Sequence, residues 1–385
     1  MAGGGEENPC PHQKPCSPSP KMRESKQSGK KMTIDNELLE ASSIYTVGTD
    51  QRKSSRWTKI GPLLWICLSA LFLIYGSRLM EAAHIATFSW SLWMAYTALG
   101  MICISFSRLK GIRQAFPAPE LVLFIGMGFA INVFFQYFFT SSTEASVDDF
   151  LYCFDVKNFG ANCDLVLARL SQNLPACRVF LIFVYAALPL LFASVYLALP
   201  NSGQLRRRYC AAIFLTSAVV FSLYAVCPAA GPLYRFGPVF PFHMPAAVVP
   251  HPIVLKGVRL DATPSGHLAW ALIVYWFARR YFQRPGAWLT GVFVLLTICA
   301  TMGTGEHYAV DLLLGVPTAV SVWIIVHGRW KAAICLLLAV LIWEILLRTG
   351  WALHVAQPLV WVACATTLAV PLYLLSRTPS FVWTD

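Results

Sequence analysis

Residues 261–277 read DATPSGHLAWALIVYWF, so a short polar cluster opens directly onto a long apolar run. The run has the composition of a membrane helix. A histidine at the start of such a helix costs free energy, so its presence there suggests a function. The whole chain fits this interpretation. Of its 385 residues 57% are hydrophobic and only 13% are charged, and the mean hydropathy is +0.57. Soluble domains carry about 25% charged residues, so the sequence predicts a membrane protein.

Apolar runs that cross or nearly cross a bilayer recur from residue 61 onward. We predict an all-α, multi-pass transmembrane helical bundle of about ten spans, and the short first, sixth and seventh runs leave that count open by one or two. The predicted spans are 61–77, 89–107, 120–140, 179–199, 210–227, 266–282, 287–303, 308–326, 332–348 and 355–376. Residues 1–56 are polar and rich in Pro, Gly, Ser and Lys, and predict a disordered, basic cytoplasmic tail.

Positive charge predicts the orientation of the bundle. The chain up to residue 60 holds ten Lys or Arg, and twelve more lie in the connections 108–113, 206–208, 279–284 and 327–331 and at Arg377. With ten spans all of these fall on one side, which the positive-inside rule makes the cytoplasm. Both termini are then cytoplasmic, and the opposite face borders a periplasm or an organelle lumen. The net charge of +11 is explained by the Lys and Arg residues on the cytoplasmic side and by their attraction to anionic lipid headgroups. No nucleic-acid partner is therefore expected.

The predicted outer loop 141–178 contains Cys153, Cys163 and Cys177. They could support a disulfide in an oxidising compartment, with one cysteine left over. Glu344 lies inside the ninth predicted span, where pairing with a neighbouring helix is the simpler interpretation and a functional role is the alternative.

Two histidines are predicted to meet on the outer face. His267 opens one span, and His307 opens another after a hairpin of two helices returns the chain to the same side. Asp311 follows His307 by four residues, so the two share a helix face. Its carboxylate can accept a hydrogen bond from one ring nitrogen and leave the other free as a nucleophile. The same spacing could be half of a metal site, but no third ligand stands at a suitable spacing, so no metal is expected.

The residues before His267 suit a phosphate. Ser265 can cap the helix, Gly266 lets an anion approach the backbone, and the first free N–H groups point outward. His267 is then a candidate general acid. Three nearby cations could bind the phosphate, although each could equally contact lipid headgroups at the rim of the site. They are Arg235, Lys256 and Arg259.

PSGH at 264–267, followed about forty residues later by H-x-x-x-D at 307–311, resembles the type 2 phosphatidic acid phosphatase superfamily over roughly residues 141–326. The resemblance implies a six-helix phosphatase-like core at 141–326. N-terminal transmembrane helices at 57–140 and C-terminal helices with a short tail at 327–385 would flank it. It also implies that His307 attacks phosphorus to form a phosphohistidine, that Asp311 orients it and that His267 protonates the leaving oxygen. Ser265 and the N–H of Gly266 would hold phosphate oxygens.

The chain departs from that family in the basic residues that hold the phosphate, which we call the phosphate clamps. The usual Lys-x6-Arg-Pro before PSGH is absent, and Thr301 stands six residues before His307, where the family has an arginine. With TMGTGEHYAVDLLLG (301–315) and CPAAGPLYRF (227–236), the altered pattern is similar to the branch that contains inositol phosphorylceramide synthases. Sphingomyelin synthases share a comparable EHY-x-x-D. We predict that Arg235 and Arg259 replace the missing clamps.

These features favour a cofactor-free membrane enzyme that takes a phospholipid or sphingolipid substrate. It would transfer a phosphoryl or phospho-headgroup to water or to a lipid alcohol, which leaves phosphatase and transferase open. The alternative is a non-catalytic lipid-binding or transport protein that retains a degenerate site. The missing clamps are the best support for that alternative.

Overall fold

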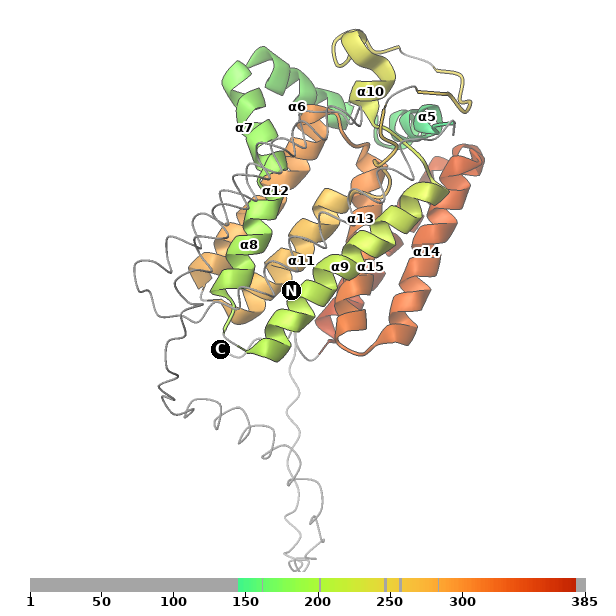
Figure 1. Cartoon of the computed structure of the whole chain (residues 1–385). Helices are drawn as coiled ribbons and strands as arrows, with labels where there is room; N and C mark the ends of the chain where they lie inside the picture. Colours follow the sequence, from blue (N-terminus) through green and yellow to red (C-terminus); the bar gives the residue numbers. More distant parts are fainter. Residues whose placement is uncertain are drawn as a thin grey trace, which may run out of the picture. The chain divides into compact units, whose positions relative to one another are not determined.

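The computed structural model describes residues 145–160, 162–200, 202–245, 248–255, 258–282 and 284–378. The tail at 1–56 and the predicted spans 61–77, 89–107 and 120–140 lie outside these residues. Within the described ranges the chain is helical, and its β pairing is limited to an isolated bridge between Ser146 and Ile253. A helical membrane bundle is therefore confirmed (Figure 1).

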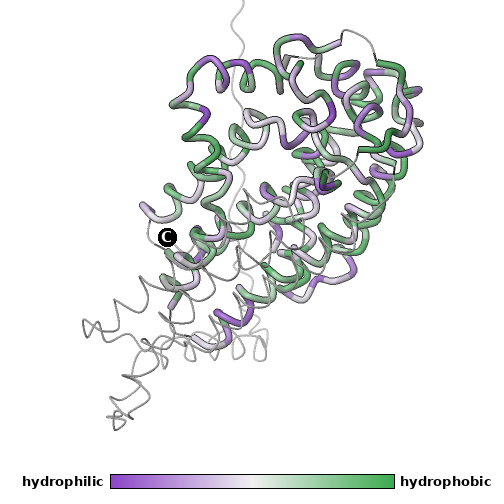
Figure 2. Tube along the Cα trace, turned by 45° about the horizontal axis from the view of Figure 1, so that its top comes forward, coloured by the Kyte–Doolittle hydropathy of each residue, from purple (hydrophilic) through white to green (hydrophobic). Residues whose placement is uncertain are grey.

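Five of the described helices are long and apolar enough to cross a membrane, and Figure 2 shows their hydrophobic stretches. They correspond to predicted spans and are α9 (Gly203–Val226), α12 (Arg284–Thr304), α13 (Ala309–Val326), α14 (Trp330–Arg348) and α15 (Gln357–Ser376). The helix that begins within the PSGH motif, α11 (Gly266–Tyr281), has 16 residues and runs alongside α12 and α13.

The predicted span 179–199 is not one helix. It is divided between α7 (Pro175–Ala186) and α8 (Leu188–Ala198), with Ala187 between them. Pro189 explains the break, because proline lacks the N–H that a continuous helix needs and is tolerated in a first turn. Before α7 comes α6 (Asn162–Asn173), and the segments Leu165–Asn173 and Pro175–Ala186 are bent by 119°, as in a broken span or a re-entrant loop.

Helix α13 lies at the centre of the bundle. It contacts α9, α11, α14 and α15 and the short helix α5 (Asp148–Phe159). Its first turn carries Asp311, and farther along it packs closely against the start of α11. A Cβ added to Gly315 would lie 3.0 Å from the carbonyl oxygen of Ser265. The tight packing of α11 against α13 holds the PSGH segment next to the start of α13.

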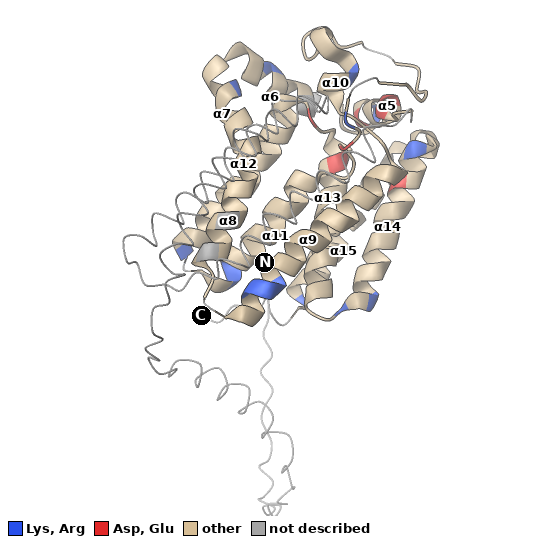
Figure 3. Cartoon of the chain, viewed as in Figure 1, with Lys and Arg blue, Asp and Glu red and all other residues tan. Residues whose placement is uncertain are grey.

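Acidic and basic residues are distributed unequally along the bundle (Figure 3). The end that carries α5, α10 (Pro232–Phe236), and the turns η2 (Gly237–Val239) and η3 (Trp351–His354) holds the acidic clusters. At the opposite end, where α9 begins and α11 ends, the described charges are basic, including Arg206, Arg279 and Arg280. The predicted catalytic residues all lie toward the acidic end.

Two predictions about isolated residues can be compared with the structure. Cys153 and Cys177 are free thiols, and the side chain of Cys163 lies outside the described part. Glu344 of α14 is fully buried, and neither carboxylate oxygen has a hydrogen-bond partner within the described ranges. The expected pairing with a neighbouring helix is therefore not found there.

Candidate active site

His307 lies in the turn between α12 and α13 and is almost completely buried, with 2% of its surface exposed. Its Nδ1 is 2.7 Å from the carbonyl oxygen of Ala262. A carbonyl oxygen can only accept, so Nδ1 carries the hydrogen, and in the neutral ring the lone pair is on Nε2. The backbone before PSGH therefore fixes which nitrogen of His307 can act as a nucleophile.

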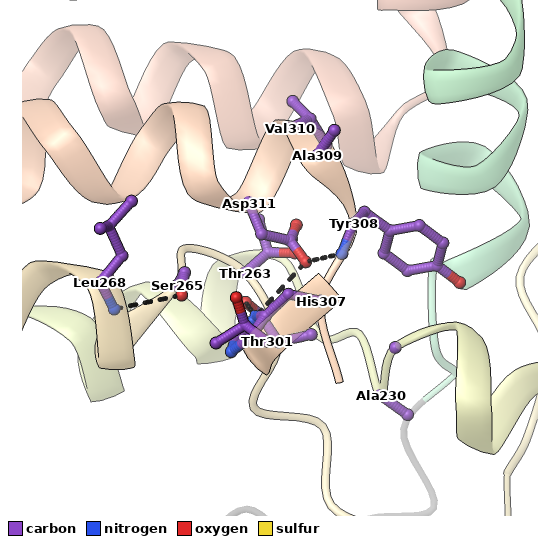
Figure 4. A network of polar contacts seen from close by, with 12 residues as sticks. Ala230, Thr263, Ser265, Leu268, Thr301, His307, Tyr308, Ala309, Val310 and Asp311 are labelled. Carbon is purple, nitrogen blue, oxygen red and sulfur yellow. Dashed lines mark hydrogen bonds and ion pairs between the residues drawn. The ribbon is translucent and has the colours of Figure 1, made fainter. Parts of the chain in front are cut away.

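Asp311 also lies beside His307, but its carboxylate is farther from Nδ1 than the carbonyl oxygen of Ala262 is. Its Oδ2 is 3.6 Å from Nδ1 of His307, beyond the usual hydrogen-bond range. The carboxylate instead accepts the N–H of Tyr308 at 2.8 Å and the hydroxyl of Thr263 at 2.5 Å, which caps the start of α13 (Figure 4). Asp311 thus joins the loop before α11 to the first turn of α13 and adds negative charge next to His307.

The charge around His307 changes its proton affinity. Burial by itself lowers the pKa of the imidazole. Asp311, Glu306 and the carbonyl of Ala262 outweigh burial, so the pKa of His307 is raised above its usual value. A protonated ring has no free lone pair on Nε2, so the nucleophilic form of His307 becomes more abundant as the pH rises.

His267 is brought to the same place by α11. Its ring centroid is 6.1 Å from that of His307, and its face stacks on Tyr185 of α7 at 3.8 Å. The two imidazole rings meet edge to face, with an angle of 64° between their planes. The predicted meeting of the two histidines is therefore seen in the structure, and Tyr185 is a further neighbour that the sequence analysis did not identify.

Ser265 and Gly266 form the start of α11, and both contact other parts of the protein. Ser265 is the N-cap residue, and its hydroxyl accepts the N–H of Leu268 at 3.4 Å. The backbone of Gly266 packs against the hydroxyl of Tyr224 on α9. A Cβ on Gly266 would lie 2.7 Å from that hydroxyl oxygen. Packing against α9 therefore already accounts for a glycine at this position.

This contact gives a test of why Gly266 is a glycine. We expect Gly266→Ala to lower the free energy of unfolding by about 1–3 kcal/mol through overpacking. In a Tyr224→Phe background most of that loss should be recovered, because the clashing oxygen is gone. Thermal unfolding in detergent of the two single variants and the double variant measures the coupling. If the double variant gains nothing back, close approach of an anion becomes the better explanation for the glycine.

The three predicted cations have different surroundings. Arg259 is partly exposed (28%) and pairs with Asp261 at 3.5 Å. Burial opposes the charge of Arg259, but Asp261, Tyr185, Tyr234 and Glu306 together raise the pKa of its guanidinium. Arg259 therefore belongs to the same cluster of interacting polar groups as Glu306, which directly precedes His307. Arg235 instead donates two hydrogen bonds, in a bidentate arrangement, to the buried carboxylate of Asp149 at 2.5 and 3.2 Å. Lys256 lies outside the described residues.

Two acidic residues of α5 hold the turn that carries His307 in place, and the sequence analysis did not identify them. Asp148 accepts hydrogen bonds from the Tyr308 hydroxyl and from the N–H groups of Ala230 and Gly231. Asp155 accepts the N–H of Ala309 at 2.6 Å, which is the first residue of α13. Carboxylates at a helix N-terminus are stabilising. The two acids therefore fix the residues that directly follow His307.

The described residues contain no group of three His, Cys, Asp or Glu side chains that could hold a metal ion. Two histidines and a carboxylate converge on a capped helix start, and this arrangement suits attack by a histidine on phosphorus. Comparison with known proteins points in the same direction. Residues 156–325 match the PAP2 superfamily. The match supports a lipid phosphatase or phosphotransferase type of function in general. No curated protein and no solved structure gave a match.

The segment that matches the PAP2 superfamily begins inside α5 and ends inside α13. It includes both histidines, but it starts after Asp148, Asp149 and Asp155. Thr301, which stands where the superfamily has an arginine, is buried, and its hydroxyl donates to the carbonyl of Thr297 at 3.0 Å. Figure 4 shows Thr301 beside His307. A neutral side chain thus takes the position of one clamp, and support of the site extends to residues before the matched segment.

Proposed function

We propose that the protein transfers a phosphoryl or phospho-headgroup from a lipid phosphate or phosphodiester to a hydroxyl, by way of a phosphohistidine on Nε2 of His307. The observation that carries this proposal is the hydrogen bond from Nδ1 to the Ala262 carbonyl, because it leaves Nε2 as the nucleophile. The match to the PAP2 superfamily supports the lipid class of the substrate.

In the first half of the reaction, Nε2 of His307 forms a bond to phosphorus while the bond from phosphorus to the leaving oxygen breaks. His267 gives its proton to that oxygen. Asp311 stabilises the positive charge that develops on the ring of His307. Transfer of a phosphoryl group depends mostly on positioning and electrostatics. We assign this work to the start of α11 at Ser265 and Gly266 and to Arg259, with Lys256 as a further candidate cation.

Arg235 has a different part in this proposal. Its guanidinium is held by Asp149, so we assign it to the support of the loop around α10 and not to the phosphate. We further propose that the site faces the periplasm or a lumen, because the opposite end of the bundle carries the arginine-rich connections. The similarity of TMGTGEHYAVDLLLG (301–315) and CPAAGPLYRF (227–236) to the branch that contains inositol phosphorylceramide synthases supports transfer to a lipid alcohol over release to water.

The test uses purified protein in detergent micelles with a panel of ³²P-labelled phospholipids, including phosphatidic acid and phosphatidylinositol, and with diacylglycerol or ceramide as acceptor. We expect an acid-labile, base-stable label on the wild-type protein that is absent in His307→Ala. A matched control is His354→Ala, which changes a histidine of the turn before α15 and should keep the label. A new labelled lipid would identify a transferase, and free phosphate alone would identify a phosphatase.

A specific observation favours one second candidate, a lipid-binding protein without turnover. Thr301 replaces one expected clamp, and Arg235 is paired with Asp149. Removing one charged contact from such a site typically costs about 3–4 kcal/mol of transition-state stabilisation. Lipid binding that is equal in the wild type and in His307→Ala, with no label on either, would support this second function and contradict the first.

A further inference from the structure

Glu306 directly precedes the proposed nucleophile, and its backbone is fixed from two sides. Its N–H donates to the carbonyl oxygen of Thr301 at 3.1 Å. Its own carbonyl oxygen lies so close to Gly231 that a Cβ added there would approach it to 2.3 Å. The hydroxyl of Tyr234 donates to Oε1 of Glu306 at 3.2 Å. The backbone of Glu306 is therefore fixed beside His307, and its carboxylate is held by Tyr234.

The surroundings of Glu306 give its carboxyl group an unusual proton affinity. Burial raises its pKa, and the nearby charge of Asp261 raises it further. His307, Arg259 and the Tyr234 hydrogen bond lower the pKa only partly, and the result is about 7. With Tyr185 of α7, these are the titratable and charged groups near Glu306 among the described residues; they come from its own turn, from the loop before α11, from α10 and from α7. The group can therefore both bind and release a proton near neutral pH.

A purely structural role does not account for this carboxylate. Tyr234 is 40% exposed, so its hydroxyl could bond to water, and a neutral amide could accept the same hydrogen bond. A negative charge beside a phosphate also repels the substrate. The first half of the reaction uses His267 as a proton donor and gives Glu306 nothing to do. In the second half the attacking water or alcohol must lose its hydrogen, and two groups could take it: His267, which is neutral after giving up its proton, and the carboxylate of Glu306.

We propose that the carboxylate of Glu306 is the general base of the second half-reaction, an assignment that rests on the phosphohistidine route above. The hydroxyl oxygen of the acceptor forms a bond to phosphorus as the bond from phosphorus to Nε2 of His307 breaks. The acceptor proton passes to Glu306, and the electron pair of the broken bond returns to Nε2. Glu306 then releases this proton to solvent, and His267 takes a proton from solvent before the next cycle.

The central experiment separates formation of the phosphoenzyme from its discharge. The wild type and Glu306→Gln are mixed with ³²P-labelled phosphatidic acid or phosphatidylinositol in micelles and quenched at short times. Glutamine keeps the size of the side chain and can accept the Tyr234 hydrogen bond, so the variant should fold. We expect Glu306→Gln to load His307 normally and to discharge the label about a hundredfold more slowly or worse, as loss of a general base typically does. An unchanged discharge rate would overturn the assignment.

The pH dependence and the acidity of the acceptor give readouts that a structural role would not change. Wild-type discharge should rise with pH through a midpoint near 7 and level off above it, since the ionised carboxylate is the base, and Glu306→Gln should lose this dependence. Trifluoroethanol, an acidic alcohol that needs little help to lose its proton, should restore discharge in the variant better than ethanol does. Equal restoration by both alcohols would contradict the proposal.

Asp261→Asn is the matched carboxylate control. Asp261 raises the pKa of Glu306, so its removal should move the midpoint of the discharge profile to lower pH while keeping the profile itself. A midpoint that does not move would argue against Glu306 as the titrating group. If the wild type forms no label that depends on His307, the proposed function fails and this assignment fails with it. A normal label with unchanged discharge in Glu306→Gln overturns only the assignment.

Discussion

Asp148→Ala is expected to prevent the protein from reaching a stable folded state. The carboxylate of Asp148 is fully buried and accepts hydrogen bonds from Tyr308, Ala230 and Gly231 at 2.8–2.9 Å. Each buried group left without a partner costs about 1–3 kcal/mol. Three such groups together approach the whole stability of an ordinary domain, which is about 5–15 kcal/mol. Yield of monodisperse protein and thermal unfolding in detergent are the measurements.

Two further variants make this prediction specific. Tyr308→Phe removes only the hydroxyl donor and should cost much less, about 1 kcal/mol. Asp149→Ala changes the adjacent carboxylate, whose partner Arg235 is partly exposed at 26% and can be hydrated when unpaired. We expect the loss of stability to be largest for Asp148→Ala, smaller for Asp149→Ala and smallest for Tyr308→Phe. Equal stability of Asp148→Ala and the wild type would show that α5 does not hold the catalytic turn.

Gly231→Ala is expected to reduce lipid turnover by about a hundredfold or more. Gly231 has a φ of +96°, and a Cβ there would lie 2.3 Å from the carbonyl oxygen and 2.7 Å from the carbonyl carbon of Glu306. Both atoms belong to the backbone, so no side-chain rotation relieves the clash. The turn that carries His307 must therefore shift. A displacement of about 1 Å at a reacting group can cost about 100-fold in rate.

Gly237→Ala is the matched control for this prediction. Gly237 also has a positive φ, +52°, but a Cβ added there meets no atom within 4 Å. Its substitution carries only the backbone strain of a left-handed residue, about 1–2 kcal/mol. Turnover of a labelled phospholipid by both variants, together with their thermal stability, separates strain from displacement. A similar loss of turnover in the two variants would mean that the Gly231–Glu306 contact does not position His307.

The arrangement of helices and the meeting of His267 with His307 could be predicted from sequence because both follow from counting membrane crossings. Two spans of known length return the chain to the face it left. The α7–α8 break was missed because the hydropathy of 179–199 is continuous and masks the effect of Pro189. The hydrogen bond from His307 to Ala262 could not be predicted, because a backbone carbonyl has no signature in the sequence.

The supporting residues were harder to predict for a different reason. Asp148 and Asp155 were visible as acidic residues of an outer loop, and their spacing of seven places them on one helix face. Their partners, however, lie more than 80 residues away in the chain. The same limit applies to Arg235 and Arg259. Both are basic residues of one loop, and only the position of Asp149 distinguishes the structural arginine from the one near the catalytic turn.

The hydrogen bond between Asp148 and Tyr308 joins residues 160 positions apart, and this separation affects how the protein is made. Helices enter the membrane in order during synthesis, so α5 must wait for α9, α11 and α12 before it can meet the start of α13. Contacts between such distant segments form late because the loop between them has to be closed first. A partly inserted chain would hold both histidines without the geometry to use them. Lipid chemistry at this site would then begin only after the start of α13 has met α5.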